Sequence, residues 1–360
     1  MKRFFRYSVF IFIAALILVN PEGTMYYAKN TIELLEDVLI PSLFPFFVCS
    51  GLLIYSGVAE AISRRLAFVM RPLFNINASG AAAVVLGLLS GYPLGSETAV
   101  RLYDEGNISK SECERLLAFC NNSGPLFIMG TVGLSLFGNR KAGIILYVCH
   151  VLSALTVGMI FKFYKRDNGS ETLETKKDTS ERNLGEIYKN AIWGSVRSIA
   201  IVSGTVLFFS VVLNLIAGLL PDSFIRELFV ILGEVTSGVK RISLSDLELQ
   251  KKILLAAAAA GFAGISVHLQ VMSIASGKGI NLKPYLIGKA LHAIFAALYT
   301  AIALIISPIT TTAFAGGSTV SGSFFFASLF TVATSLMLIL LSAATMITNK
   351  IRLAVTKRMR

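Results

Sequence analysis

The chain has 360 residues, of which 54% are hydrophobic and 15% charged, and its mean hydropathy is +0.70. A soluble domain cannot bury that much apolar surface, so the composition indicates a polytopic membrane protein. The formal net charge of +12 does not indicate nucleic-acid binding, because most basic residues stand at the ends of apolar runs rather than on one clustered face.

Apolar runs follow one another along the chain, and most reach the roughly 20 residues that a spanning helix needs. They cover residues 4–19, 38–57, 79–102, 115–137, 142–163, 192–219, 252–276, 285–306 and 322–347. Two amphipathic pieces, 59–75 and 224–239, suit the membrane interface or the bundle interior. The sequence therefore predicts an all-α polytopic fold, with the acidic residues 20–37 as an outer loop.

The run 79–102 has basic residues on both sides, which marks both ends as cytoplasmic. A segment with both ends on one side must turn round within the membrane. The tetrapeptide Ser90-Gly91-Tyr92-Pro93 stands near its middle and is unsuited to a continuous helix. We therefore predict a re-entrant helical hairpin, whose freed backbone must face protein or a watery cavity.

The two halves of the chain align without a gap when Gly91 is placed on Gly264 and Lys110 on Lys283. This register predicts two repeats, each with a hairpin and a broken transmembrane helix, and a second hairpin tip near Ile265. If 224–239 lies in the interface, the second repeat is inverted; if it spans the membrane, the repeats are parallel. The basic flanks favour the parallel case, but 224–239 is a poor span, and we expect inversion.

The predicted organisation has five parts. They are an N-terminal transmembrane helix with its lead-in (1–30), a first Gate-like repeat (31–164), a flexible cytoplasmic linker (165–187), a second Gate-like repeat (188–348) and a basic C-terminal tail (349–360).

The first hairpin tip is the strongest candidate for a substrate site. A tip leaves N–H groups unpaired, and the helix that follows directs its positive end towards the tip, which suits an anionic group. The alternative is a kinked packing helix with small residues for close contact. The candidate binding residues are Ser90, Gly91, Tyr92, Pro93, Gly95 and Ser96.

A second candidate is the polar run Asn121, Asn122 and Ser123, which interrupts the span 115–137. Pro125 has no N–H, so it leaves the carbonyl of residue 121 free to face a ligand or an ion. Two adjacent amides in a membrane helix are costly unless they have partners. Alternatively, these amides only join two neighbouring helices.

The expected second tip adds Gly264, Ser266, His268 and Gln270 to the substrate-binding candidates. The last three alternate, so they cannot share one helical face. For proton or ion coupling the candidates are Glu97, Glu234 and His268. Glu234 also suits capping or ion pairing, and His268 a structural role; His150 and His292 are weaker candidates.

The chain contains no Walker A loop, no Gly-x-Ser-x-Gly, no His-Glu-x-x-His and no cysteine cluster. The spacing of its four cysteines, Cys49, Cys113, Cys120 and Cys149, matches no zinc site. We therefore expect no enzymatic activity, no metal and no cofactor.

Four motifs in order, SGYPLGSETAVRLYDEGNIS, ERLLAFCNNSGPLFIMGTVG, GEVTSG and GFAGISVHLQ, resemble those of the sporulation integral membrane proteins of the YlbJ type. The resemblance covers about residues 30–345. It implies two nucleoside-recognition (Gate) domains, two hairpins and inverted repeats, in a layout similar to that of concentrative nucleoside transporters.

The resemblance also implies a function. Such a protein is a secondary transporter or facilitator that moves dipicolinic acid, a small planar dianion, out of the mother cell across the outer forespore membrane of a sporulating bacterium. Asn121 or Asn122 would then hydrogen-bond the ring nitrogen or a carboxylate. The alternatives are a carrier for nucleosides or other small metabolites, and a non-transporting membrane scaffold for spore morphogenesis. The expected partners are a small anionic solute and the lipid bilayer, and the oligomeric state stays open.

Overall fold

The structure, a computed structural model, describes residues 2–165, 183–221 and 223–309. The predicted span 322–347, the basic tail 349–360 and most of the linker 165–187 lie outside the described residues.

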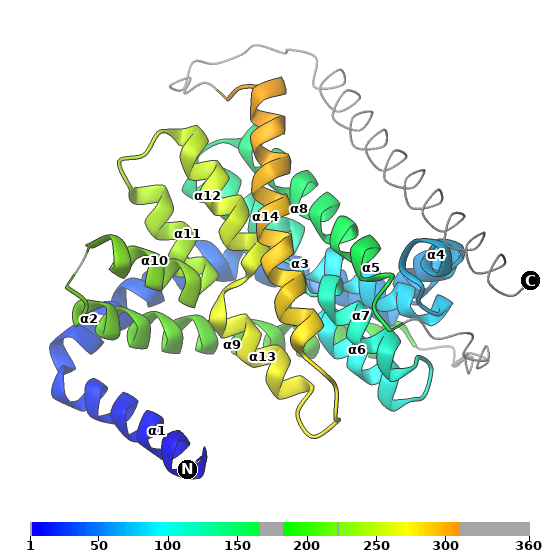
Figure 1. Cartoon of the computed structure of the whole chain (residues 1–360), viewed down its shortest axis with the longest axis horizontal. Coiled ribbons are helices and arrows are strands. Elements are labelled where there is room, and N and C mark those ends of the chain that lie inside the picture. The colour runs from blue at the N-terminus through cyan, green and yellow to red at the C-terminus, as the bar shows by residue number, and fades with distance from the viewer. Residues whose placement is uncertain (1, 166–182, 222, 310–360) are drawn as a thin grey trace, which may run out of the picture. The chain divides into compact units, whose positions relative to one another are not determined.

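All regular secondary structure in the described ranges is helical, as the sequence predicts (Figure 1). The elements of the first half are α1 (Lys2–Val19), α2 (Pro21–Leu34), η1 (Leu35–Leu39), α3 (Ile40–Tyr55), α4 (Val58–Phe74), η2 (Ala78–Gly80), α5 (Ala81–Ser90), α6 (Leu94–Asp104), α7 (Lys110–Cys120), η3 (Leu126–Leu136) and α8 (Arg140–Phe161). Those of the second half are α9 (Leu184–Gly218), α10 (Ser223–Gly233), α11 (Val235–Leu244), α12 (Leu249–Phe262), α13 (Gly264–Ile274) and α14 (Lys283–Ile306).

Five helical segments of the described chain are long and apolar enough to cross a membrane, which confirms the membrane class. They are Pro21–Tyr55, Arg140–Phe161, Leu184–Gly218, Leu249–Ile274 and Lys283–Ile306. The shortest of them has 22 residues, or about 33 Å of helix, which exceeds the ~30 Å hydrocarbon core of a bilayer.

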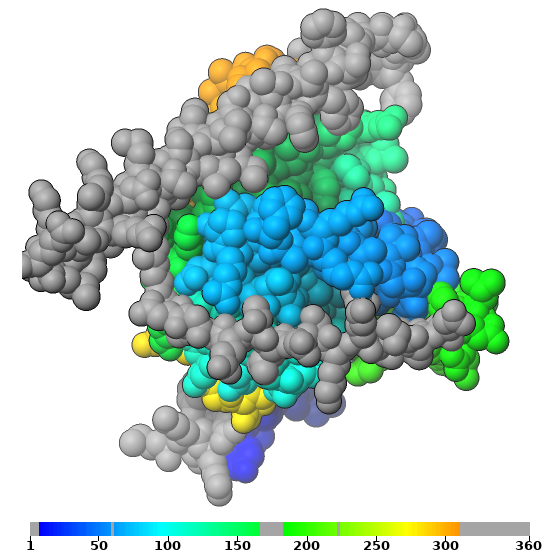
Figure 2. Space-filling view, turned by 90° about the vertical axis from the view of Figure 1, so that its right-hand side faces the viewer, coloured from blue at the N-terminus to red at the C-terminus, as the bar shows by residue number. Residues whose placement is uncertain are grey.

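The helix α4 is amphipathic and lies across the direction of the segment that follows it. The chain bends by 109° between Ala61–Phe74 and Ala78–Ser90. Ile62, Leu66 and Phe68 of α4 are exposed, and the light-blue α4 is visible on the face shown in Figure 2. An exposed apolar stripe on a crosswise helix suits the membrane interface, as the pattern of 59–75 predicts.

The expected outer loop at residues 20–37 is wrong, because this stretch is helical. Asn20 caps α2 by accepting a hydrogen bond from the N–H of Gly23 at 2.9 Å, and Pro21 occupies the first turn. An Asn-Pro pair in these positions is a helix start signal. The helix then continues through η1 into α3, so that Pro21–Tyr55 forms one segment of 35 residues.

The re-entrant hairpin predicted in 79–102 is present as α5 and α6, which pack side by side. A Cβ built on Gly87 would stand 3.2 Å from Cα of Gly95 and 1.8 Å from the carbonyl oxygen of Cys120. Both arms therefore approach each other and α7 more closely than any larger residue permits.

The second hairpin predicted near Ile265 is wrong. The helices α12 and α13 belong to one apolar segment, Leu249–Ile274, which is interrupted at Ala263 and Gly264 (φ of 73° and 82°) and does not double back. The doubling back occurs earlier, where α10 and α11 pack side by side around Glu234. The predicted single amphipathic helix 224–239 is therefore a hairpin.

The same order of elements occurs twice in the described chain: a short helical hairpin, an interrupted helix and a long helix. The first set is α5–α6, α7 with η3, and α8; the second is α10–α11, α12 with α13, and α14. In this order the tip at Gly91 corresponds to the turn at Gly233 and Glu234. The register that paired Gly91 with Gly264 is therefore wrong, while the inverted orientation of the halves stays a prediction.

Candidate functional site

In the first half, the hairpin tip lies directly against the break that follows α7. Gly91 has a φ of 83°, and a Cβ built on it would stand 2.9 Å from the backbone nitrogen of Gly124. Glycine is needed on both counts, because other residues rarely adopt this conformation and a side chain has no room. The tip and the break therefore form one packed unit.

The second half repeats this arrangement, because the tip of the α10–α11 hairpin packs against the break between α12 and α13. A Cβ on Gly264, in the break between α12 and α13, would stand 3.0 Å from the nitrogen of Val235 and 3.2 Å from Cα of Glu234. In each half, then, a hairpin tip covers the break of the interrupted helix that follows it. Backbone groups freed at membrane depth are tolerated only in such protected places.

The break after α7 consists of Asn121, Asn122 and Ser123, which are all fully buried. The carbonyl oxygen of Asn121, which Pro125 leaves without its helical partner, accepts a hydrogen bond from Nζ of Lys289 at 2.9 Å. The freed carbonyl predicted from the sequence thus faces the side-chain nitrogen of a lysine of the same chain.

A hydroxyl pair joins the tip to the break. The Tyr92 hydroxyl and Oγ of Ser123 are hydrogen-bonded to each other. Beside them, the amide nitrogen of Asn122 donates to the carbonyl of Phe119 at 2.8 Å, while Oδ1 of Asn122 and Oγ of Ser90 are buried without a protein partner. Buried polar atoms are normally satisfied, so these two atoms are suited to contact a ligand.

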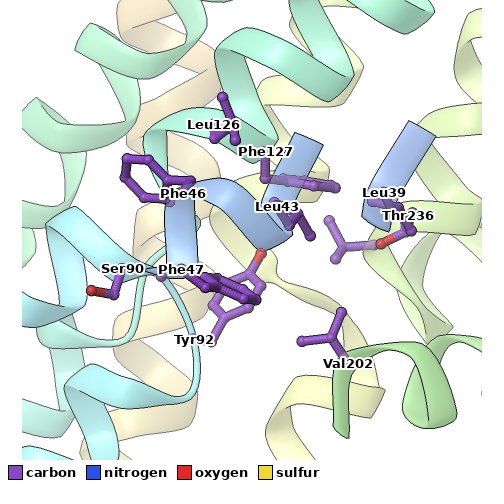
Figure 3. Close-up of a pocket in the computed structure, with 13 residues that line it drawn as sticks. Leu39, Leu43, Phe46, Phe47, Ser90, Tyr92, Leu126, Phe127, Val202 and Thr236 are labelled. Carbon is purple, nitrogen blue, oxygen red and sulfur yellow. The ribbon is translucent and has the colours of Figure 1, made fainter. Parts of the chain in front are cut away.

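A cavity of about 50 Å³ lies where the two hairpins meet α3 and α9 (Figure 3). Most of the side chains around it are apolar or aromatic, and Tyr92 and Thr236 add hydroxyl groups. Its lining residues are Leu39, Leu43, Phe46, Phe47, Ser90, Gly91, Tyr92, Gly124, Leu126, Phe127, Val202, Val235 and Thr236. Both hairpin tips and Gly124, which directly follows the first break, therefore border the same space, whereas Asn121, Asn122 and Ser123 do not line it.

The remaining predicted residues of the first tip do not line the cavity. Pro93 is the N-cap of α6, and Gly95 packs on Cys120, with a Cβ position 2.0 Å from its carbonyl oxygen. Ser96 is fully buried and its Oγ has no protein partner. Glu97 is exposed on α6.

The residues predicted around the second break also lie away from the cavity. Ser266 is buried in α13, and Gln270 is half-buried further along the same helix. Nδ1 of His268 lies 2.8 Å from the hydroxyl of Tyr285. Gly264, as described above, contributes the contact with the α10–α11 turn.

Glu234 is the N-cap of α11 and is almost completely buried. Its two carboxylate oxygens accept hydrogen bonds from the N–H groups of Thr236 at 2.9 Å and Ser237 at 2.7 Å. The start of α11 therefore already binds a carboxylate, as the unpaired N–H groups and the positive end of a helix favour.

Three residues around the first break are ones that the sequence reasoning missed or ranked low. Lys289 was not among the candidates, and it is fully buried, as are His150 and His292. A lysine inside the apolar run 285–306, with a histidine three residues later, was the available signal, because ionisable residues within membrane segments are functional candidates.

Glu114, just before the apolar run 115–137, anchors a cluster at one end of the bundle. Its carboxylate accepts hydrogen bonds from the Asn281 N–H (3.0 Å), the Lys165 ammonium (2.9 Å) and the Tyr164 hydroxyl (3.1 Å). Burial alone raises the pKa of Glu114, but these hydrogen bonds outweigh it and lower the pKa below the usual value. The cluster ties the start of α7 to the end of α8 and to the segment before α14.

The family model described as Gate, nucleoside recognition, matches residues 38–166. The chain is 31% identical over 327 residues to the sporulation integral membrane protein YlbJ of Bacillus subtilis (strain 168), in an alignment that covers 81% of this chain and 80% of that protein. No solved structure matches the chain.

Proposed function

Because the chain belongs to the family of YlbJ sporulation integral membrane proteins, we propose that it is a secondary transporter or facilitator for a small anionic solute. The observation that supports this most is the meeting of two hairpin tips and a broken helix around one cavity among membrane-length helices. Carriers commonly place solute sites at discontinuous helices of this kind. We expect no enzymatic activity of the chain itself.

The lining of the cavity favours a planar aromatic solute. Phe46, Phe47, Phe127 and Tyr92 all border it (Figure 3). Aromatic rings stack on one another or meet edge to face, and mostly apolar linings with a few hydroxyl groups are typical of small-molecule sites.

The uncapped start of α6 at the first tip favours an anion. The α6 helix begins at Pro93 without a side chain that caps its N–H groups, whereas the α11 helix begins with the bound carboxylate of Glu234. The second tip shows that a hairpin of this chain binds a carboxylate, and the first tip offers the same kind of site to a solute. The buried Lys289 is a group that can carry positive charge behind the break.

A scaffold has no need for buried amides, hydroxyls and an ammonium group at membrane depth, because such groups are costly there. The described residues place these groups at the break, and Gly124, which directly follows it, borders the cavity. This arrangement favours a carrier over a purely structural role.

The solute that we propose is dipicolinate, moved out of the mother cell across the outer forespore membrane. The relative is named as a sporulation protein, and a planar ring with two carboxylates combines the two properties that the site favours. The description of the matched family model, nucleoside recognition, supports a nucleoside as the second candidate.

The cavity of about 50 Å³ is far smaller than the roughly 300–1,000 Å³ of pockets that hold drug-sized ligands. We infer that the arrangement described is too narrow to hold the solute. Entry of the solute requires the first hairpin to move relative to η1 and α3, which supply Leu39, Leu43, Phe46 and Phe47 to the lining.

Counterflow in proteoliposomes tests the proposal. Vesicles that contain the purified protein and are loaded with unlabelled dipicolinate should accumulate labelled dipicolinate transiently, and protein-free vesicles should not. Exchange of labelled uridine instead of dipicolinate would support the nucleoside alternative. Exchange of neither solute would contradict the proposed transport and leave the scaffold role.

A further inference from the structure

A closed ring of hydrogen bonds surrounds the break after α7. Nζ of Lys289 donates to the carbonyl of Asn121 (2.9 Å) and lies 3.4 Å from Nδ1 of His292. Nε2 of His292 lies 3.0 Å from the carbonyl oxygen of His150, and Nε2 of His150 accepts from the N–H of Ser123 at 3.1 Å. The ring therefore begins and ends at the break, and passes through α14 and α8.

The partners fix where the protons of the two imidazoles lie. A carbonyl only accepts, so Nε2 of His292 carries a hydrogen and its Nδ1 accepts from Lys289. A backbone N–H only donates, so Nε2 of His150 carries the lone pair. Both rings are therefore neutral, and protonation of either at the accepting nitrogen would break the ring of hydrogen bonds.

Lys289 is the member of the ring that can change its charge without losing a hydrogen bond. The ring uses two N–H groups of Lys289. A neutral amine supplies two such groups, and an ammonium supplies three. The third proton is therefore free to bind or leave while the ring stays closed.

The surroundings of Lys289 contain no carboxylate that compensates its charge, as far as the described residues show. The helices α7, α8 and α12 pack on α14, and the titratable groups in electrostatic range are Cys120, His150, His292 and His268. A fully buried ammonium without an acidic partner has a large desolvation cost, which negative charge from another source would offset.

The ring is connected to the cavity by one further hydrogen bond. Ser123, whose N–H is part of the ring, also pairs through Oγ with the Tyr92 hydroxyl. Tyr92 lines the cavity (Figure 3). An anion at the tip therefore lies close to the break that holds the charge of Lys289.

From this geometry we propose that Lys289 is the proton-binding group of the carrier, and that it takes up one proton for each anionic solute that enters the cavity. The proton adds to the lone pair of the amine from one side of the membrane and leaves to water on the other. The bound anion favours the ammonium, and the ammonium favours the bound anion by the same factor. This inference rests on the proposed transport of an anion.

Two substitutions of Lys289 separate charge from hydrogen bonding. Lys289→Arg stays charged at every relevant pH, and Lys289→Gln keeps two N–H donors without a charge. Lys283→Gln, at the exposed start of α14, is the matched control. All three full-length variants and the wild type are reconstituted in proteoliposomes, with the membrane potential clamped at zero.

With one proton per solute, an inward gradient of one pH unit should drive roughly tenfold accumulation of dipicolinate by the wild type and by Lys283→Gln. Lys289→Arg and Lys289→Gln should both lose the accumulation that follows the pH gradient. Accumulation by both Lys289 variants at the wild-type level would overturn the proposal. So would wild-type accumulation that follows a sodium gradient and ignores the pH gradient.

If the wild type shows no counterflow of dipicolinate, the proposed function is refuted. The inference that Lys289 binds a proton is then tested by a measurement that needs no solute. The thermal unfolding of each protein in detergent is followed between about pH 5 and pH 9, where histidine and perturbed amines titrate. Proton exchange at Lys289 should make the wild-type profile differ from that of Lys289→Arg, or of Lys289→Gln if the arginine variant does not fold. Superimposable profiles would refute it.

Discussion

Replacement of Gly91 by alanine tests whether the contact between the tip and the break is needed for transport. Gly91 has a φ of 83° and a ψ of −171°, a backbone region that almost only glycine occupies. The new Cβ would also stand 2.9 Å from the nitrogen of Gly124 and 3.3 Å from its Cα. Both atoms belong to the backbone and cannot swing away as a side-chain end does.

The cost of this substitution has two parts. The backbone conformation contributes about 1–3 kcal/mol, and the overpacking against Gly124 contributes about 1–3 kcal/mol more. If the tip moves away from the break, both costs are avoided, but the fraction of molecules in the native arrangement falls. Because about 1.4 kcal/mol corresponds to a factor of ten, we expect the rate of counterflow to fall at least tenfold.

Gly106→Ala is the matched control, because it carries the strain without the contact. Gly106 has a φ of 74°, and nothing lies within 4 Å of the position of its Cβ. It follows α6 in an exposed turn, away from the cavity. We expect this variant to lose about 1–2 kcal/mol of stability and to keep its transport.

The assay measures counterflow of labelled solute in proteoliposomes at equal protein content, together with the melting temperature in detergent. Gly91→Ala should lose transport out of proportion to any loss of melting temperature. Equal counterflow by Gly91→Ala and Gly106→Ala would refute the reasoning, because the tip and the break would then not need to touch.

Three further substitutions address the cap, the break and the cluster at Glu114. Glu234→Ala removes the cap of α11 and should cost about 1–2 kcal/mol in chemical unfolding, whereas Glu234→Asp should retain most of it. Pro125→Ala supplies an N–H that competes with Lys289 for the carbonyl of Asn121, so counterflow should fall while membrane levels hold. The pKa of Glu114 is lower in the folded protein than in the unfolded chain. Its hydrogen bonds therefore stabilise the fold at pH values above the unfolded pKa of about 4.3, and this stabilisation is lost as the pH falls through the folded pKa. Melting curves of Glu114→Gln and the wild type should differ at neutral pH and converge in acid.

The first hairpin could be predicted because two independent signals coincide in the sequence. Basic residues on both sides of 79–102 require the chain to return, and Ser90-Gly91-Tyr92-Pro93 shows where it turns. The second hairpin carries weaker signals. Its turn has the pattern Gly-Glu-x-Thr-Ser, which is a helix end followed by a cap, but the amphipathic period of 224–239 continues across it.

The segment 252–276 shows the limit of a break signal. Gly261, Ala263 and Gly264 indicate that a helix is interrupted, and the structure shows the interruption at Ala263 and Gly264. An interruption does not say whether the chain turns back or continues. Packing decides this. The turn at Glu234 packs against Gly264, and α13 continues in the direction of the span.

The partners of the first break could not be predicted from one sequence. The carbonyl freed by Pro125 follows from local chemistry, but the ammonium group that binds it comes from a residue 168 positions later. Nothing in the local pattern distinguishes Lys289 from a lysine that reaches out to the membrane surface. Its role becomes visible only when α7, α8 and α14 are packed together.

The two places where a hairpin tip packs on a break differ in the charged groups that the protein itself supplies, and we expect them to have different roles. The α11 helix begins with the carboxylate of Glu234, which already uses the N–H groups of Thr236 and Ser237. A solute carboxylate cannot use the same N–H groups while Glu234 holds them. The first break instead holds the side-chain nitrogen of Lys289, without a carboxylate among the described neighbours, and the α6 helix at its tip has no capping side chain. We therefore expect the charge of the proposed anionic solute to be met at the first tip, so substitutions there should impair transport, whereas substitutions at Glu234 should mainly impair stability.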